Sequence, residues 1–187
     1  MVEYVAQAFG LVGMTMNILS FQRKEQKNII FMQMVGSIFF AVNYFMIGAF
    51  AGALLNIVGI IRATAYWQRE RFRTDKLGWV FAFGAMYVAV YILSFVLFGT
   101  AGTPRNYAVE LLPVVGMLIT TVSYYLGEAK KVRILGLVNA PFWLTYNIIN
   151  FAIGGIVTES VSLVSIIIAM CRYDFKKESG KNEKAES

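Results

Sequence analysis

The second half of this chain repeats the first half. Residues 12–67 recur at 115–170 without a gap, and both copies read as three apolar helical segments. The matching residues include Val12-Gly13-Met14 with Val115-Gly116-Met117, and the pairs Ser20/Ser123, Glu25/Glu128, Lys27/Lys130, Val35/Val138, Phe39/Phe142, Ala49/Ala152, Gly52/Gly155 and Val58/Val161. Apolar segments match one another easily by chance, but a constant offset through three helices and two connections argues against chance. Such duplication is typical of membrane transporters built from two halves around a shared pathway.

The composition predicts a membrane protein. Hydrophobic residues make up 58% of the chain, and the mean hydropathy is +0.60, whereas soluble domains contain about 45–50% apolar residues. A helix that crosses the hydrocarbon core needs about 17–25 apolar residues. Seven segments approach this length, at 4–21, 29–47, 50–67, 78–98, 108–126, 132–150 and 153–171. We therefore predict an all-α integral membrane protein with seven transmembrane helices.

The repeat divides these helices into two parallel units. Residues 4–67 form the first three-helix repeat, and 108–173 form the second. Residues 68–107 supply a linker helix with its loops, including an outer loop at 99–107. Three helices reverse the side on which the chain emerges, so one linker helix must return it before the second unit begins. Residues 174–187 read as a disordered cytoplasmic tail, because they are polar and charged.

The basic residues predict the orientation of the chain. The net charge is +6, and the lysines and arginines, Arg133 among them, concentrate after the first, third and fifth predicted helices and in the tail. Only Arg105 falls in an opposite loop, and Arg62 lies within the third helix, from which we expect it to snorkel to the cytoplasmic interface. The positive-inside rule then places the N-terminus outside and the C-terminus in the cytoplasm. The basic excess is an orientation signal, with anionic lipid as a secondary contact, and no nucleic-acid partner is predicted.

Several classes of chemistry are excluded by residues that the chain lacks. There is no histidine, so histidine catalysis, histidine metal sites and histidine proton relays are impossible. Cys171 is the single cysteine and forms no intrachain disulfide. No phosphate-binding glycine loop and no catalytic carboxylate pair is present. We therefore predict no enzyme activity, no catalytic residue, no metal and no cofactor.

Glu159 is the strongest candidate for a functional residue. It is the one acidic residue well inside an apolar segment, where a charge is expensive and usually faces a cavity or a partner. Its counterpart in the first repeat is Asn56, and Gly52 and Gly155 stand one turn earlier in each copy. We predict that Asn56 and Glu159 bind substrate where the two units meet. The alternative is that they only join helices, by bonding to each other or to the backbone.

The second and sixth predicted helices add further candidates. They carry amides and aromatic rings, a combination that suits polyhydroxyl or heteroaromatic solutes. Near the inner mouth, Asn17 and Gln33 are candidates for an inner gate. The alternative for the aromatic residues is that they face lipid. The predicted substrate-binding residues from these two helices are Asn43, Asn139, Trp143, Tyr146 and Asn147.

Two stretches resemble a known family. Residues Glu110-Leu-Leu-Pro-Val-Val-Gly116, followed by Ile153-Gly-Gly155 and Glu159, resemble the bacterial inner-membrane YgjV family over most of residues 4–173. The layout of three, one and three helices also resembles SWEET sugar facilitators, SemiSWEETs and PnuC vitamin transporters. In SWEET proteins an asparagine in the third helix of each unit faces the sugar. Asn56 matches that position and Glu159 departs from it, which argues against strict specificity for a neutral sugar.

Together these features predict a small-solute transporter of the bacterial cytoplasmic membrane, either a uniporter or proton-coupled. A sugar-like or nucleoside-like substrate is expected first and a cationic metabolite second. The alternatives are a non-transporting receptor or scaffold protein, and a channel with a continuous pore. The expected partners are a small-molecule substrate and the lipid bilayer. Because one chain contains both units, we expect a monomer.

Overall fold

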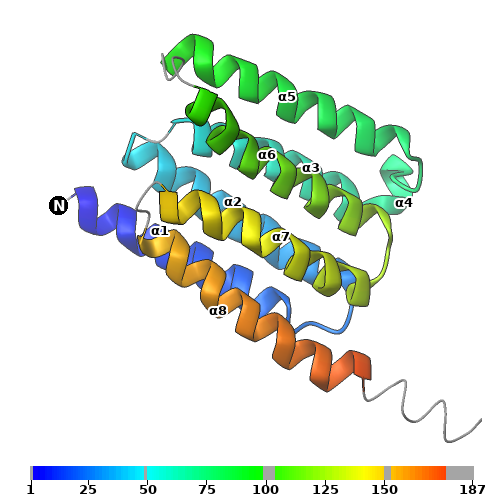
Figure 1. Cartoon of the computed structure of the whole chain (residues 1–187). Helices are drawn as coiled ribbons and strands as arrows, with labels where there is room; N and C mark the ends of the chain where they lie inside the picture. The colour runs from blue at the N-terminus through cyan, green and yellow to red at the C-terminus, as the bar shows by residue number, and fades with distance from the viewer. Residues whose placement is uncertain (1, 49, 99–103, 150–152, 176–187) are drawn as a thin grey trace, which may run out of the picture.

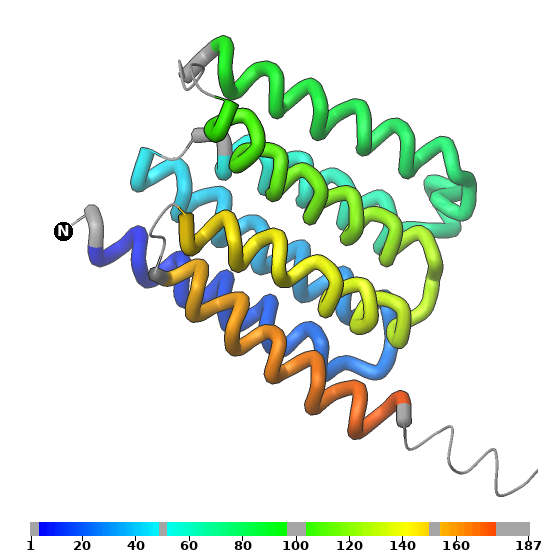
Figure 2. The backbone as a smooth tube through the Cα atoms, viewed as in Figure 1, coloured from blue at the N-terminus to red at the C-terminus, as the bar shows by residue number. Residues whose placement is uncertain are grey.

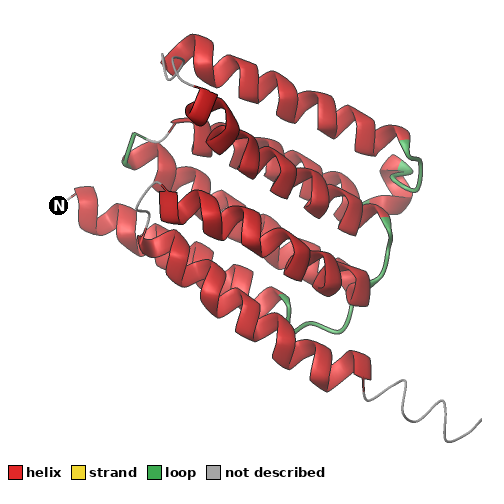
Figure 3. Cartoon of the chain, viewed as in Figure 1, coloured by secondary structure: helices red, strands yellow, loops and turns green. Residues whose placement is uncertain are grey.

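The computed structural model describes residues 2–48, 50–98, 104–149 and 153–175, and all regular structure within these ranges is helical (Figures 1 and 3). The long helices lie side by side, and successive helices run in opposite directions (Figure 2). The elements are α1 (Val2–Ser20), α2 (Gln26–Met46), α3 (Phe50–Trp67), α4 (Arg69–Phe72), α5 (Gly78–Phe98), α6 (Pro104–Tyr125), α7 (Ala129–Ile149), α8 (Ile153–Ala169) and the π-helix η1 (Met170–Phe175).

Four described segments are long and apolar enough to cross a membrane. These are Gln26–Met46, Gly78–Val96, Pro104–Tyr125 and Gly154–Asp174. The outward surface is strongly apolar as well: on α5, Phe81 is 69% exposed and Val96 is 74% exposed. Such a surface on a folded chain fits contact with lipid better than contact with water.

The predicted boundaries differ from the observed ones in three places. Helix α6 begins at Pro104, so the predicted outer loop 99–107 is wrong for its last four residues; proline suits the first turn of a helix, where its missing N–H is not needed. The short helix α4 was not predicted, and Arg73, with φ of 52°, ends it in the left-handed conformation. The predicted tail starts too early, because η1 continues to Phe175; residues 176–187 lie outside the described part of the chain.

Within the described residues, six long helices form a closed ring, and a seventh long helix lies outside it. Helices α1, α2 and α3 pack in chain order, and so do α6, α7 and α8. The ring closes where α1 packs on α8 and where α3 packs on α6, while α2 also contacts α7. Helix α5, the predicted linker, packs on α3 and α6 at the edge of the bundle (Figure 1). The two groups of three helices therefore face each other across a common interior.

Glycines allow the closest approach of neighbouring helices. A methyl group added to Gly13 in α1 would lie 3.1 Å from the carbonyl oxygen of Gly36 in α2, and the reverse substitution gives the same distance. Both glycines are buried, so the two backbones meet directly. Small residues at such crossings are a common basis of helix packing in membranes.

Arg62 is buried at the contact between α3, α5 and α6, and the predicted snorkelling is wrong. The side chain is only 5% exposed. Its Nη1 donates to the Tyr87 hydroxyl at 3.0 Å and to the Met117 carbonyl oxygen at 3.1 Å, and the guanidinium lies 4.9 Å from the centre of the Tyr124 ring. Helices α5 and α6 cover this position and supply its acceptors, and no local sequence pattern indicates where those helices pack.

Arg133 is also buried, contrary to its predicted place among the loop charges. It forms an ion pair with Asp174 of η1, a residue that the sequence places in the tail. The two side chains are 2% and 5% exposed. The pair therefore belongs to the folded body of the protein, at the end of the bundle where the basic connections gather.

A polar cavity between the two groups of helices

A cavity of about 650 Å³ occupies the interior of the six-helix ring. All six ring helices contribute lining residues, and α5 contributes none among the described residues. Its volume falls within the range of about 300–1,000 Å³ that is typical of small-molecule sites. The wall combines aromatic and aliphatic side chains with amides, hydroxyls and one carboxylate. The cavity is therefore large and polar enough to hold a metabolite.

Six of the seven predicted substrate-binding residues line this cavity. They come from α2, α3, α7 and α8, and they are Asn43, Asn56, Asn139, Trp143, Asn147 and Glu159. Tyr146 is not among the lining residues, and its side chain is paired with Glu110 of α6 instead. Spacing on α7 explains the difference, because residues four apart share one helix face, whereas a step of one residue turns the side chain by about 100°. Tyr146 therefore leaves the face that Asn139, Trp143 and Asn147 share.

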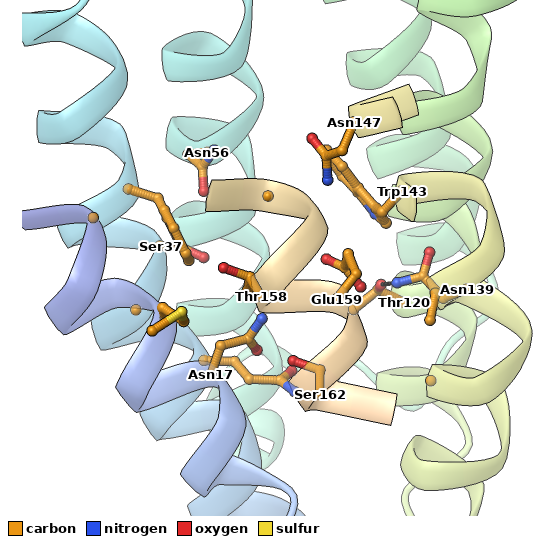
Figure 4. A pocket seen from close by; sticks show the side chains of 18 of the residues that line it. Asn17, Ser37, Asn56, Thr120, Asn139, Trp143, Asn147, Thr158, Glu159 and Ser162 are labelled. Atoms are coloured by element: carbon orange, nitrogen blue, oxygen red, sulfur yellow. Dashed lines mark hydrogen bonds between the residues drawn. The ribbon is translucent and has the colours of Figure 1, made fainter. Parts of the chain in front are cut away.

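Glu159 enters the cavity from α8. Figure 4 shows its carboxylate on the side of the cavity where Thr120 and Asn139 lie. The carboxylate makes no hydrogen bond and no ion pair with any residue in the described part of the chain. Its repeat counterpart Asn56 donates from Nδ2 to the Gly52 carbonyl oxygen of its own helix at 2.9 Å. Glu159 and Asn56 thus share a cavity but are not bonded to each other.

Glycines make room for the polar groups of α7. A methyl group on Gly155 would overlap the Asn147 amide, and one on Gly116 would overlap Trp143 and lie 2.7 Å from Oδ1 of Asn139. Because Gly116 has no side chain, α6 and α7 lie close enough for a hydrogen bond of 3.2 Å from Asn139 Nδ2 to Thr120 Oγ1. These contacts hold the α7 face in its place on the cavity wall.

Sequence reasoning missed several hydroxyl groups in the wall. Thr120, Thr158 and Ser162 line the cavity beside the predicted residues (Figure 4). On α8, Thr158 directly precedes Glu159, and Ser162 lies one turn after it. The helical spacing from Glu159 could therefore have indicated Ser162. Thr120 is the repeat counterpart of Asn17, which also lines the cavity.

The cavity is closed at the end where the basic connections lie. Its lining residues there, Phe21, Val132 and Ile166, are buried. At the opposite end, which contains the N-terminus, the lining residues Gln7 and Ile47 are exposed. The cavity therefore opens towards the end of the bundle that is away from the basic connections.

Hydrogen bonds between the two groups of helices reinforce the closed end. Gln22, which follows α1, donates to the carbonyl oxygen and hydroxyl of Ser165 in α8 at 2.7 and 2.9 Å. Gln26 donates to the Tyr124 carbonyl oxygen in α6 at 2.9 Å. The predicted gate residue Gln33 accepts a bond from the Tyr124 hydroxyl and donates to Ser20. These bonds connect α1 and α2 to α6 and α8 at the closed end of the cavity.

Among the described residues, no group of three or more histidine, cysteine, aspartate and glutamate side chains is placed to hold a metal ion. Glu159 is the single carboxylate among the described lining residues. The arrangement offers hydrogen bonds, one carboxyl group and aromatic faces, which are the elements of a binding site.

Apolar outer surfaces around a polar, solute-sized cavity define a helical membrane protein with an internal binding space. The chain belongs to the Imp-YgjV family, described as bacterial inner membrane protein, whose model matches residues 4–177. It is similar to the inner membrane protein YgjV of Escherichia coli (strain K12), with 25% identity over 162 residues, covering 86% of this chain and 80% of that protein. No solved structure gives a significant match.

The protein is therefore a bacterial inner membrane protein with several membrane-spanning helices. This finding confirms the predicted location in the bacterial inner membrane and the resemblance to the YgjV family. The resemblance to SWEET, SemiSWEET and PnuC transporters stays a prediction.

Proposed function

We propose that this protein transports a small solute across the inner membrane, and that the solute binds in the cavity between two three-helix repeats. The observation that carries the proposal is the cavity itself. It is lined by all six ring helices, open at one end and closed by hydrogen bonds at the other. A pathway that is open to one side at a time is the basis of alternating access.

The helix contacts support two parallel repeats and seven spans. Exchanging α1, α2 and α3 with α6, α7 and α8 turns the α1–α8 contact into the α6–α3 contact and leaves the α2–α7 contact unchanged. The α1–α8 contact and its counterpart, the α3–α6 contact, are both present, as a two-fold axis along the membrane normal requires. In this proposal α5 is the odd helix that returns the chain across the membrane.

Glycine contacts support the same relationship at the level of single residues. Gly13 faces Phe40, and its counterpart Gly116 faces Trp143, the residue that matches Phe40 in the repeat. Gly52 faces Tyr44, and Gly155 faces Asn147 in the same way. Equivalent glycines therefore accommodate equivalent side chains, although the side chains themselves differ.

The charge distribution supports an outward-open state. The basic connections follow α1, α3 and α6 and lie at the closed end (Figure 1). The positive-inside rule makes that end cytoplasmic, with the N-terminus outside and the C-terminus inside. The open end of the cavity then faces the periplasm. Transport requires the two repeats to rock, so that the Gln22 and Gln26 bonds break and the outer end closes.

Uptake into proteoliposomes tests the proposal. The purified protein is reconstituted, incubated with an isotopically labelled metabolite extract, and the lumen is analysed by mass spectrometry. Protein-free liposomes and an Asn56→Trp variant, whose indole would obstruct the cavity, are the controls. Time-dependent, saturable accumulation that both controls lack supports transport.

The same preparation distinguishes the alternatives. A receptor predicts that a metabolite raises the melting temperature of the protein while nothing accumulates in the lumen. A channel predicts ionic current that does not saturate with solute. Either result would replace transport as the function of the cavity.

A further inference from the structure

We propose that the cavity binds an organic cation that carries a protonated amine, with the ammonium group at Glu159 and an apolar or aromatic part against Trp143. This rests on the proposed function only in treating the cavity as a solute site. It narrows the substrate class from sugars, nucleosides and cations to amines. Three features of the wall support it: its charge, its hydrogen-bonding polarity and its aromatic faces.

The charge of the wall is unbalanced. No lysine or arginine is present among the described lining residues, and Glu159 is the one acidic residue there. Arg62 contacts Met117, which lines the cavity, but Arg62 itself is directed to Tyr87 and does not line it. A buried charge is usually paired, because an unpaired one is costly. An anionic solute would be repelled by Glu159, and a neutral one would leave it without a counter-charge.

Two asparagines turn their oxygens towards the cavity. Asn43 donates from Nδ2 to the Ala6 carbonyl oxygen at 2.7 Å, and Asn56 donates to the Gly52 carbonyl oxygen at 2.9 Å. A backbone carbonyl only accepts hydrogen bonds, so each amide must present its nitrogen to the backbone. Oδ1 of each residue is therefore left as an acceptor, together with the second N–H of the amide as a donor.

Two threonine hydroxyl groups of the wall have the same polarity. Thr120 donates its hydroxyl hydrogen to the Gly116 carbonyl oxygen at 3.0 Å, and Thr158 donates to the Gly154 carbonyl oxygen at 2.8 Å. Each oxygen then remains only as an acceptor. Because Thr120 has used its hydrogen, Asn139 must donate to it.

This arrangement leaves a buried acceptor without a partner. Asn139 Oδ1 has no hydrogen bond among the described residues, and it is buried against Gly116, where an added methyl group would lie 2.7 Å from it. The acceptors left for a ligand are therefore the side-chain oxygens of Asn43, Asn56, Thr120 and Thr158, beside the Glu159 carboxylate. An ammonium group supplies three donors and no acceptor.

Aromatic side chains complete the site. Phe40, Tyr44 and Trp143 line the cavity together with the acceptors. Aromatic faces attract cations and also pack against an apolar body. A bare metal ion would use only the acceptors, whereas the cavity of about 650 Å³ has room for an organic molecule. The combination favours an amine with a carbon framework.

The experiment compares compounds that differ only in amine against hydroxyl. The probes are phenethylamine with 2-phenylethanol, and glucosamine with glucose, near neutral pH, where both amines are largely protonated and the Glu159 carboxyl is not driven to its neutral form by acid. Binding to the full-length protein in detergent is measured by calorimetry and by the shift in melting temperature. Three proteins are compared: the wild type, Glu159→Gln and Glu128→Gln. The last removes the same charge from an exposed residue outside the cavity.

We expect at least one amine to bind about tenfold or more tightly than its hydroxyl partner, because hydrogen bonds to charged groups are the stronger ones. Glu159→Gln should abolish this preference, and Glu128→Gln should keep it. If Glu159→Gln does not fold, Glu159→Asp replaces it and should weaken the preference without abolishing it. Equal binding within both pairs, a preference that survives in Glu159→Gln, or no binding by either amine would overturn the proposal.

Failure of this proposal is distinguishable from failure of transport. Proteoliposomes that accumulate a neutral or anionic solute would retain the transport function and overturn the amine class. Amine binding that depends on Glu159, without accumulation of any solute, would retain the amine site and overturn transport.

Discussion

Arg133 and Asp174 form a two-pronged ion pair inside the protein. Arg133 Nε lies 2.8 Å from Oδ2 of Asp174, and Nη2 lies 2.6 Å from Oδ1. The remaining Nη1 donates to the carbonyl oxygen of Arg23, beyond the end of α1, at 3.0 Å. One guanidinium thus links α7, η1 and the α1–α2 connection, which come from both groups of helices. The pair should be important for the stability of the closed end.

Breaking this ion pair should destabilise the protein strongly. Asp174→Ala leaves the buried guanidinium without its counter-charge, a change that typically costs about 3–5 kcal/mol. The measurement is the melting temperature in detergent. Glu128→Gln is the matched control, because it breaks an exposed ion pair with Lys131 whose side chains are 58% and 42% exposed. Exposed pairs contribute about 0–1 kcal/mol, so equal shifts for the two variants would contradict the prediction.

Neighbouring glycines on α8 should respond oppositely to alanine. Gly155→Ala places a methyl group on the Asn147 amide and should destabilise the protein by about 1–3 kcal/mol, as overpacking usually does. Gly154→Ala meets no atom within 4 Å and should be neutral or slightly stabilising. Thermal unfolding of both variants checks this difference. Equal tolerance at the two positions would show that Asn147 is not held against Gly155.

The Tyr87 hydroxyl should stabilise the buried Arg62. Tyr87→Phe removes an acceptor from a cation and should cost about 1.5–3 kcal/mol, the range for hydrogen bonds to charged groups. Tyr91→Phe, one turn further along α5, removes only a bond to the exposed Tyr107 carbonyl oxygen and should cost about 0.5–1 kcal/mol. Unfolding curves of the two variants test whether Tyr87→Phe lowers the free energy of unfolding more than Tyr91→Phe does. A larger loss for Tyr91→Phe would contradict this role for Tyr87.

Removing the glutamine bonds should open the closed end. Gln22→Ala combined with Gln26→Ala removes the bonds to Ser165 and Tyr124. Spin labels at positions 24 and 128, in a Cys171→Ala background, should then show an added population at longer distance. Gln7→Ala at the opposite end is the control and should leave the distances unchanged. Identical distributions in all three proteins would argue against a gate at this end.

The orientation should be visible by chemical labelling of intact cells. With Cys171 replaced by alanine, a cysteine at position 105 should react with an impermeant maleimide, and a cysteine at position 75 should not. The basic connections determine this expectation through the positive-inside rule. Labelling at 75 without labelling at 105 would invert the proposed topology and place the open end of the cavity in the cytoplasm.

The long helices and much of the cavity were predictable from local pattern. Apolar runs identify α2 and α5, and the repeat pairs Asn56 with Glu159 on corresponding helices. Periodicity fails for short or unusual elements. Helix α4 has four residues, and η1 continues α8 with π-type turns, so neither produces an apolar period long enough to recognise.

The sequence by itself determined that the chain is a helical membrane protein, because hydrophobic length is a local property, and it predicted two similar halves from a constant repeat offset. The sequence also indicated Glu159 as a candidate for the cavity wall, since an acidic residue within an apolar segment is visible without a structure. Only the tertiary structure decided that Arg62 and Arg133 are buried, that Tyr146 leaves the cavity face, and that the asparagine oxygens remain free. Each of these depends on which distant groups meet a side chain, and packing between helices far apart in the chain sets those contacts.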